Sequence, residues 1–322
     1  MKKIVSLSII IILFIFSCTQ KNETKKIRIA TLKGPSAMGM VKMIDSLNQI
    51  ENSNIEISIY NEPIQVRKLM LENKVDFAVL PTTMAAILYN KGVPYQLAAI
   101  PVWGTLYLFG NDTTIKTWDD LKGKRINLMA KGMTPDVLFR HLLIKNNINP
   151  DQDLTLDYTF PTHLDLANAV AAGQSDLGVI SEPLVSLVMQ KNKNVYPIFD
   201  LNNEWKKVYE DIQIAQTAFM VKSEFAENNK ILLEQILNSY KKSDNWVNEN
   251  PEDAAQLIVK YKILPNTEVA FPSIPRSNME YIEAFPIRYQ ISEYLKIFYE
   301  MNPDIIGGIV PDDNFYLNSN KD

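Results

Sequence analysis

Hydroxyl and acidic side chains follow two apolar runs of the chain in the same order. Residues 75–80 are followed by Pro81, Thr82 and Thr83, and residues 177–180 by Ser181, Glu182 and Pro183. Each run is typical of a strand buried on both faces of a parallel sheet, and a helical pattern follows it. We expect the two threonines to be N-caps. Because open α/β sheets bind ligands where such strands end and helices begin, the repeat predicts two binding edges that face one another.

The side chains that most catalytic chemistry requires are scarce. The 322 residues contain one cysteine, Cys18, and two histidines, His141 and His163. No histidine–carboxylate spacing typical of a metal site is present, so the sequence predicts neither a metal centre nor a cofactor. A glycine-rich phosphate loop is also missing, which excludes a nucleotide-hydrolysing subunit. We expect His141 to be structural within a helix, whereas His163 begins a helix near the binding edge.

The N-terminus predicts export. Lys2 and Lys3 precede an apolar run over residues 9–16 that is too short for a hydrocarbon layer of about 30 Å. Residues 1–17 therefore indicate a signal peptide. Residues 15–18, Ile-Phe-Ser-Cys, resemble the bacterial lipobox, in which the cysteine is acylated and becomes the first mature residue. A plain signal peptide, or an uncleaved anchor with an incidental cysteine, is the alternative. Residues 18–26 are expected to form the lipidated N-terminus and a polar tether.

Charge and length restrict the class of protein further. The net charge is −4, and loss of Lys2 and Lys3 with the signal peptide makes it −6, which argues against nucleic acid as a partner. The 305 residues after the predicted cleavage (322 minus 17) are too many for one compact core and suit two lobes. No second apolar stretch reaches spanning length, so we expect a soluble domain, monomeric, that meets the membrane only through its lipid.

The order of predicted elements gives an α/β protein with two doubly wound lobes, an interlobe cleft and two hinge crossovers. We assign residues 27–105 and 215–322 to lobe 1, and residues 106–214 to lobe 2. The apolar stretch 101–109 is predicted to cross between them, and Gly104 interrupts it as a hinge or as a point of close packing. A return strand over residues 211–221 is the second crossover. The chain beyond it is predicted to be helical.

These patterns resemble a known family of proteins. The segments VDFAVLPTTMAAILYNKG, LKGKRINLMAKGMTPDVLFRHLL and AGQSDLGVISEPL are similar to those of solute-binding lipoproteins of bacterial ABC importers. The similarity covers residues 27–310 and points to the type II periplasmic-binding-protein-like fold, in the group that binds sulfonates such as taurine, nitrate, or the pyrimidine precursor of thiamine. The resemblance implies a protein that closes on a small-molecule solute and delivers it to a permease driven by an ATPase.

The resemblance also implies which loops contact the solute. Its candidate ligand-binding residues are Ser36, Met38, Thr82, Thr83, Trp103, Gly104, Met133, Thr134, Phe160, Ser181 and Glu182. Several precede helices, whose amides can hold an anionic or strongly polar group. For the hydroxyl residues the alternative is a simple N-cap, and for the aromatic residues it is the core. Glu182 can accept from a cationic amine or merely stabilise the helix dipole, and Lys131 can pair with an anion or remain solvated.

Two further functions remain open at this stage. Some enzymes share the fold, such as those of the thiamine-pyrimidine or menaquinone pathways, but they are cytoplasmic, whereas this chain carries an export signal. A sensor or docking lipoprotein that binds a partner is the other alternative. The fold alone does not separate these functions.

Overall fold

The computed structural model describes residues 26–318 except residues 52 and 130. The predicted signal peptide, Cys18 and all of the tether except Lys26 lie outside the described residues. Within the described part of the chain, no helix has both the length and the apolar character needed to cross a bilayer.

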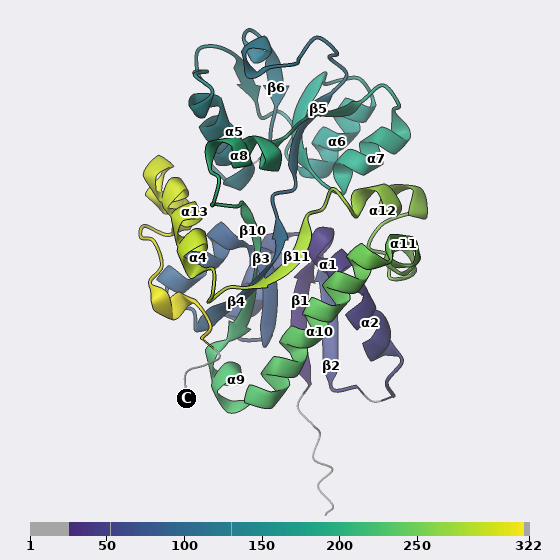
Figure 1. The fold of residues 1–322 in the computed structure, drawn as a ribbon, viewed down its shortest axis with the longest axis vertical. Helices are drawn as coiled ribbons and strands as arrows, with labels where there is room; N and C mark the ends of the chain where they lie inside the picture. The colour runs from purple at the N-terminus through teal and green to yellow at the C-terminus, as the bar shows by residue number, and fades with distance from the viewer. Residues whose placement is uncertain (1–25, 52, 130, 319–322) are drawn as a thin grey trace, which may run out of the picture.

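Two sheets form the frame of the molecule (Figure 1). The six-stranded sheet has the order β11-β4-β10-β3-β1-β2, and the five-stranded sheet has the order β7-β6-β8-β5-β9. The strands of the first are β1 (Ile27–Leu32), β2 (Ile55–Tyr60), β3 (Phe77–Pro81), β4 (Tyr95–Trp103), β10 (Ala215–Lys222) and β11 (Met279–Glu283). Those of the second are β5 (Leu106–Gly110), β6 (Arg125–Asn127), β7 (Thr155–Asp157), β8 (Leu177–Ser181) and β9 (Tyr196–Asp200).

Helices cover both faces of each sheet, as Figure 1 shows. Those packed around the six-stranded sheet are α1 (Pro35–Gly39), α2 (Val41–Asn48), α3 (Pro63–Leu71), α4 (Thr82–Asn90), α9 (Ser223–Asn228), α10 (Lys230–Glu249), α11 (Pro251–Lys260), α12 (Thr267–Ser273) and α13 (Arg288–Met301). The five-stranded sheet carries α5 (Thr134–Lys145), α6 (His163–Ala171), α7 (Leu184–Lys191) and α8 (Leu201–Val208). Short 3-10 helices are η1 (Trp118–Leu121), η2 (Pro303–Ile306) and η3 (Asp313–Phe315).

Strand β3 is buried on both faces, as its sequence predicts. Ala78 and Leu80 belong to the hydrophobic cluster on the side of α4 and α13. Phe77 and Val79 point the other way, into the cluster on the side of α2 and α10. A strand that is apolar at every position therefore has helices on both sides, which is the doubly wound arrangement.

The chain crosses between the sheets twice. Strand β4 ends at Trp103 and β5 begins at Leu106 beyond Gly104, and the chain returns from α8 into β10. Trp103 and Ala215 are paired neighbours in the six-stranded sheet, so the two crossovers run side by side. The α/β class with two doubly wound lobes and two crossovers is confirmed.

Two details of the sequence interpretation are wrong. The chain after residue 222 is not only helical, because residues Met279–Glu283 form edge strand β11 beside β4. The predicted threonine caps are also absent: α4 begins at Thr82 with Pro81 as its N-cap residue, and no side-chain cap bond forms there. Helix α5 likewise begins at Thr134 after Met133, again without a side-chain cap. The hydroxyl groups of Thr82 and Thr134 are therefore not used as caps.

Candidate functional site

Polar side chains gather where β1 and β3 end in lobe 1. Thr82 is only 1% exposed and Thr31 is fully buried, and neither hydroxyl has a hydrogen-bond partner among the described residues. Ser36, at the start of α1, lies with its Oγ 3.5 Å from Oγ1 of Thr217, which pairs with Pro81 across the sheet. A buried hydroxyl without a partner costs about 1–3 kcal/mol. A bound polar group would accept hydrogen bonds from these unpartnered hydroxyls and remove that cost.

One hydrogen bond joins the two lobes beside this edge. Oγ1 of Thr83, in the first turn of α4, lies 2.9 Å from Oγ1 of Thr134, the first residue of α5. The two helices follow β3 and β6, so the N-termini of α4 and α5 face one another from different sheets. Helix N-termini carry free N–H groups and a partial positive charge. The structure therefore brings the candidate residues Thr83 and Thr134 into contact, with Thr82 next to Thr83 in the chain.

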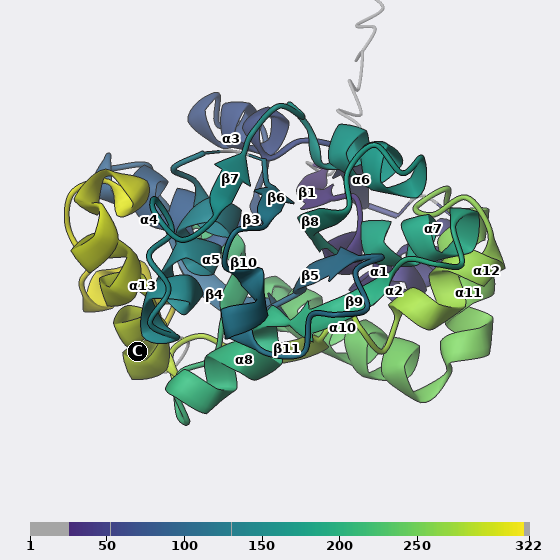
Figure 2. The ribbon, with the colours of Figure 1, turned by 90° about the horizontal axis from the view of Figure 1, so that it is seen from above.

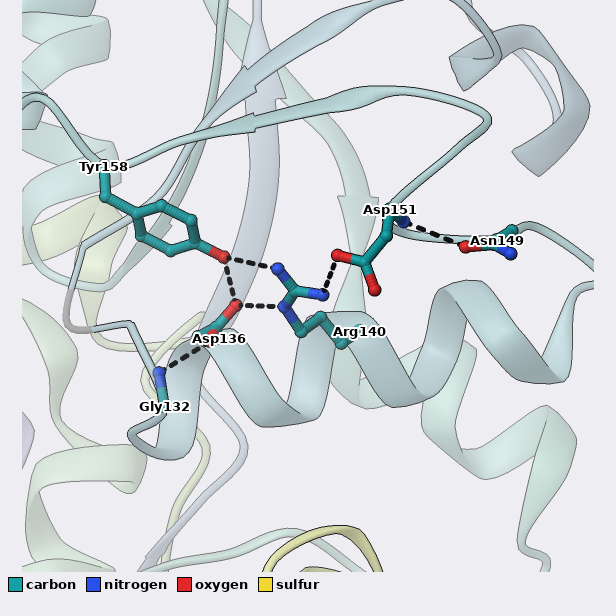
Figure 3. Close-up of polar contacts among 6 residues, drawn as sticks. All are labelled: Gly132, Asp136, Arg140, Asn149, Asp151 and Tyr158. Atoms are coloured by element: carbon teal, nitrogen blue, oxygen red, sulfur yellow. Dashed lines mark hydrogen bonds and ion pairs between the residues drawn. The ribbon is translucent and has the colours of Figure 1, made fainter.

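A network inside lobe 2 fixes the loop that precedes α5 (Figure 3). Asp136 is 2% exposed, and its carboxylate accepts from the Gly132 amide at 2.7 Å and from Arg140 Nε at 2.9 Å. The Tyr158 hydroxyl donates to the same carboxylate at 2.5 Å. Arg140 also donates to Asp151 at 2.8 Å. No local pattern in the sequence signals this network, because Tyr158 follows a different strand, β7.

Glu182 has a different environment from the one that its position suggests. Its side chain is fully buried, and its Oε1 lies 2.5 Å from Nε of Arg276, a residue between α12 and β11. The amide and hydroxyl of Ser186 donate to the same carboxylate at 3.1 and 2.9 Å. Burial raises the pKa of Glu182 above 4.5, and the charge of Arg276 opposes this shift. Glu182 thus forms an ion pair with a residue of lobe 1, and both of its carboxylate oxygens already accept hydrogen bonds.

Trp103 and Gly104 lie at the first crossover. Trp103 is 3% exposed and donates from its indole Nε1 to the Glu280 carbonyl at 2.9 Å. Gly104 lies against Asn202 of α8 so closely that an added Cβ would be 2.7 Å from Oδ1 of Asn202. The Asn278 side chain donates to the Gly104 carbonyl. Close packing against Asn202 therefore requires glycine at position 104, whether or not the crossover also bends as a hinge.

The remaining candidates are spread over both lobes. Met38 is fully buried in a hydrophobic cluster with Val247 and Ile258, so the structure gives it a packing role in lobe 1. Met133 is 52% exposed just before α5. Phe160 is half-buried against the core of lobe 2. Ser181 is half-buried at the end of β8. The structure does not gather these four side chains at one point.

Neither histidine offers a charged group at neutral pH. Burial lowers the pKa of His141 and of His163 from 6.5 to about 4. His141 Nε2 lies 2.7 Å from the hydroxyl of Tyr209, which agrees with a structural role. His163 Nδ1 has no partner among the described residues. Lys131 is exposed, with its Nζ 5.5 Å from the centre of the Tyr158 ring. Over the described residues, no group of three or more potential ligands could hold a metal ion.

Comparison with known proteins identifies the class. Residues 37–260 match the family described as "ABC transporter, phosphonate, periplasmic substrate-binding protein". A Bacillus subtilis (strain 168) protein, YtlA, named as a candidate binding protein, is 25% identical over 252 residues, which are 69% of this chain and 73% of that protein. The crystal structure of an ABC transporter from Parabacteroides distasonis superposes with a TM-score of 0.78 at 25% identity, and the match covers 91% of this chain and 99% of that one.

The periplasmic aliphatic sulphonate binding protein SsuA from Escherichia coli shares the fold. Its TM-score is 0.70 at 18% identity, over 88% of this chain and 90% of that chain. Because the family match spans most of the chain, the protein belongs to the periplasmic substrate-binding proteins of ABC transporters. Its fold is that of type II periplasmic binding proteins, as the resemblance implied. The family and these neighbours bind solutes for transporters and are not enzymes, so the enzymatic alternative is set aside.

Proposed function

We propose that this chain is a lipid-anchored, extracytoplasmic solute receptor that captures a small polar or anionic organic solute between its lobes by hinge closure. As the substrate-binding component of an ABC importer it works with a permease and an ATPase. The proposal divides the chain into lobe 1, residues 27–105 and 215–322, and lobe 2, residues 106–214. Cys18 is the proposed lipid attachment site, after removal of residues 1–17 as a signal peptide, and the receptor is proposed to be a monomer.

The unpartnered hydroxyls of Thr31 and Thr82 carry this proposal. They are buried at the edge where β1 and β3 end, beside the contact between the N-termini of α4 and α5. Hydroxyls and helix amides are donors, so this edge suits an acceptor-rich group such as a carboxylate, sulfonate or phosphonate. Thr31, Thr82 and Ser36 at this edge are uncharged donors, and Arg276 of lobe 1 is already paired with Glu182. The likeness to a sulphonate-binding protein supports the same chemistry.

The first experiment looks for the solute itself. Native mass spectrometry of protein purified from cells should detect a bound small molecule, and a thermal-shift panel should include sulfonates, phosphonates, nitrate, aminopyrimidines and aromatic carboxylates. A solute present at about 100 times its dissociation constant adds about 2.7 kcal/mol to the free energy of unfolding. If a broad panel leaves the melting temperature unchanged and no molecule co-purifies, the proposal fails.

Thr82→Val separates binding from stability. Valine keeps the shape of threonine but removes a buried hydroxyl without a partner, so the melting temperature should stay the same or rise. Loss of one hydrogen bond to the solute should weaken its binding roughly tenfold, or about 1.4 kcal/mol. Thr155→Val, at an exposed position of β7, is the matched control and should leave affinity unchanged. Equal affinity in Thr82→Val and the wild type would refute the assignment of this edge.

Lipid attachment is tested separately. Mass spectrometry of the protein from membranes should show an acylated N-terminus that begins at Cys18. Cys18→Ser should release the protein into the soluble fraction while solute binding stays unchanged. An unmodified Cys18 in membrane-bound wild-type protein would contradict the anchor and would leave the solute-binding proposal intact.

A further inference from the structure

A pocket lies between the lobes, away from the candidate solute edge. Its volume is about 390 Å³, within the range of small-molecule sites. Lobe 2 contributes Asn202 and Lys206 from α8 and Gln213 from the segment before β10. Lobe 1 contributes Trp103, Asn278 and Glu280. We call this the hinge pocket, and Figure 1 shows α8 above β11, the two elements between which it lies.

The hinge pocket and the Thr83–Thr134 contact lie on opposite sides of the crossovers. In the six-stranded sheet, β4 and β10 carry the crossovers; β11 is on one side of them and β3 and β1 are on the other. Glu280 belongs to β11, whereas Thr83 follows β3. The view from above in Figure 2 shows the same arrangement, with β11 and α8 at one edge and β1 and β3 beyond β10. The two sites are therefore separate.

The hinge pocket contains two charged groups of opposite sign that remain available. Neither Lys206 nor the carboxylate of Glu280 makes a side-chain hydrogen bond or an ion pair among the described residues, and Lys206 has only a longer-range attraction to the carboxylate of Asp200. Asn202 is 3% exposed, and its Oδ1 has no donor there. Trp103 is fixed by its bond to the Glu280 backbone, which provides a rigid wall. A cation, a carboxylate, an acceptor and an apolar wall thus line one pocket.

We propose that the hinge pocket binds a small zwitterion, such as a free amino acid. Lys206 pairs with its carboxylate, Glu280 pairs with its ammonium group, and Trp103 contacts its apolar part. Opposite charges on one small molecule complement both side chains, whereas an ion of one sign satisfies only one of them and is repelled by the other.

Occupancy of the hinge pocket depends on the angle between the lobes, because both lobes line it. When the lobes bend about the crossovers so that α4 and α5 approach one another, the gap on the opposite side, where the hinge pocket lies, widens. The Thr83–Thr134 bond is formed in this structure, so the pocket described is that of the closed arrangement. A zwitterion that fits it stabilises closure and raises solute affinity, and the solute raises zwitterion affinity by the same factor. This coupling, unlike the pocket, rests on the proposed function.

Calorimetric titration of the mature protein tests the hinge pocket. The probes are glycine, L-alanine, L-serine and L-glutamine, with acetate and methylamine as analogues that carry one charge each. At least one zwitterion should bind, and both analogues should bind at least tenfold more weakly. Lys206→Gln and Glu280→Gln should each weaken zwitterion binding about tenfold. Lys241→Gln, at an exposed position of α10, is the matched control and should bind like the wild type.

Three results would overturn the hinge pocket. The first is no binding of any zwitterion at roughly 10 mM, a concentration that detects even millimolar affinity. The second is wild-type binding by both charge variants. The third is binding that Thr82→Val abolishes and Lys206→Gln leaves intact, since the zwitterion would then occupy the solute edge. That last result supports the proposed function while it refutes the pocket, so the two failures are distinguishable.

Discussion

Arg276→Met tests the buried ion pair that joins the lobes. The Glu182 side chain is fully buried, and after the substitution only Ser186 would still donate to it. Breaking a buried pair from one side costs about 3–5 kcal/mol. Protonation limits this cost: a glutamate with the ordinary pKa of 4.5, as in the unfolded chain, is neutralised for about 3 kcal/mol at pH 7 and for less than about 1 kcal/mol at pH 5. We therefore expect a loss of about 3 kcal/mol at pH 7 that shrinks toward pH 5.

Urea unfolding at both pH values measures this loss, with an unchanged slope as the check that the transition is comparable. Arg276→Met combined with Glu182→Gln removes the stranded charge and should recover most of the stability at pH 7. Arg125→Met is the matched control: it breaks the pair of Arg125, whose side chain is 68% exposed, with Asp157, and should cost no more than about 1 kcal/mol. A loss for Arg276→Met that is below 1 kcal/mol, or is equal at both pH values, would refute the reasoning.

Two further substitutions test buried positions. Burial raises the pKa of Asp244 from 3.8 to about 7, so its contribution is fully present below pH 3.8 and is lost as the pH rises to 7, at a cost on the order of 4 kcal/mol. Asp244→Asn should remove this dependence, so that melting curves cross and the variant is the more stable at pH 8; parallel curves from pH 4 to 8 would contradict this. Gly104→Ala should cost about 1–3 kcal/mol, because its Cβ would meet Asn202 at 2.7 Å. Adding Asn202→Ala removes the Oδ1 and Cγ contacts and should recover part of the urea midpoint, because the Cβ of residue 202 remains 3.0 Å from the added Cβ; a double variant as unstable as the single one would show that the clash is elsewhere.

The local patterns of the sequence predicted much of the fold. Apolar runs such as residues 77–80 specify buried strands directly, since every side chain must find a hydrophobic neighbour on one face or the other. The order of these runs then gave the α/β class and both crossovers. Edge strand β11 was missed because an edge strand needs only one paired neighbour and carries exposed residues, such as Glu280, that weaken its apolar pattern.

The candidate site was less predictable, because side-chain partners are distant in sequence. The sequence correctly predicted that helices begin near Thr82 and Thr134. Their preference for cap positions was misleading, because Pro81 and Met133 occupy those positions. No local signal connects Glu182 with Arg276, 94 residues further along. An acidic residue next to a helix start can bind a solute, stabilise the helix dipole or pair with a basic side chain. Only the fold shows which of these interactions it makes.

The pairing of Trp103 with Ala215 has a consequence for how such a chain can be rearranged. The polypeptide leaves and rejoins the six-stranded sheet at neighbouring positions, and Cα atoms of paired antiparallel residues are only about 4.5–5.5 Å apart. A short turn can therefore replace everything in between without stretching the remaining backbone. Residues 104–214 can therefore be inserted, exchanged or deleted as one unit while the six-stranded sheet keeps its strand order.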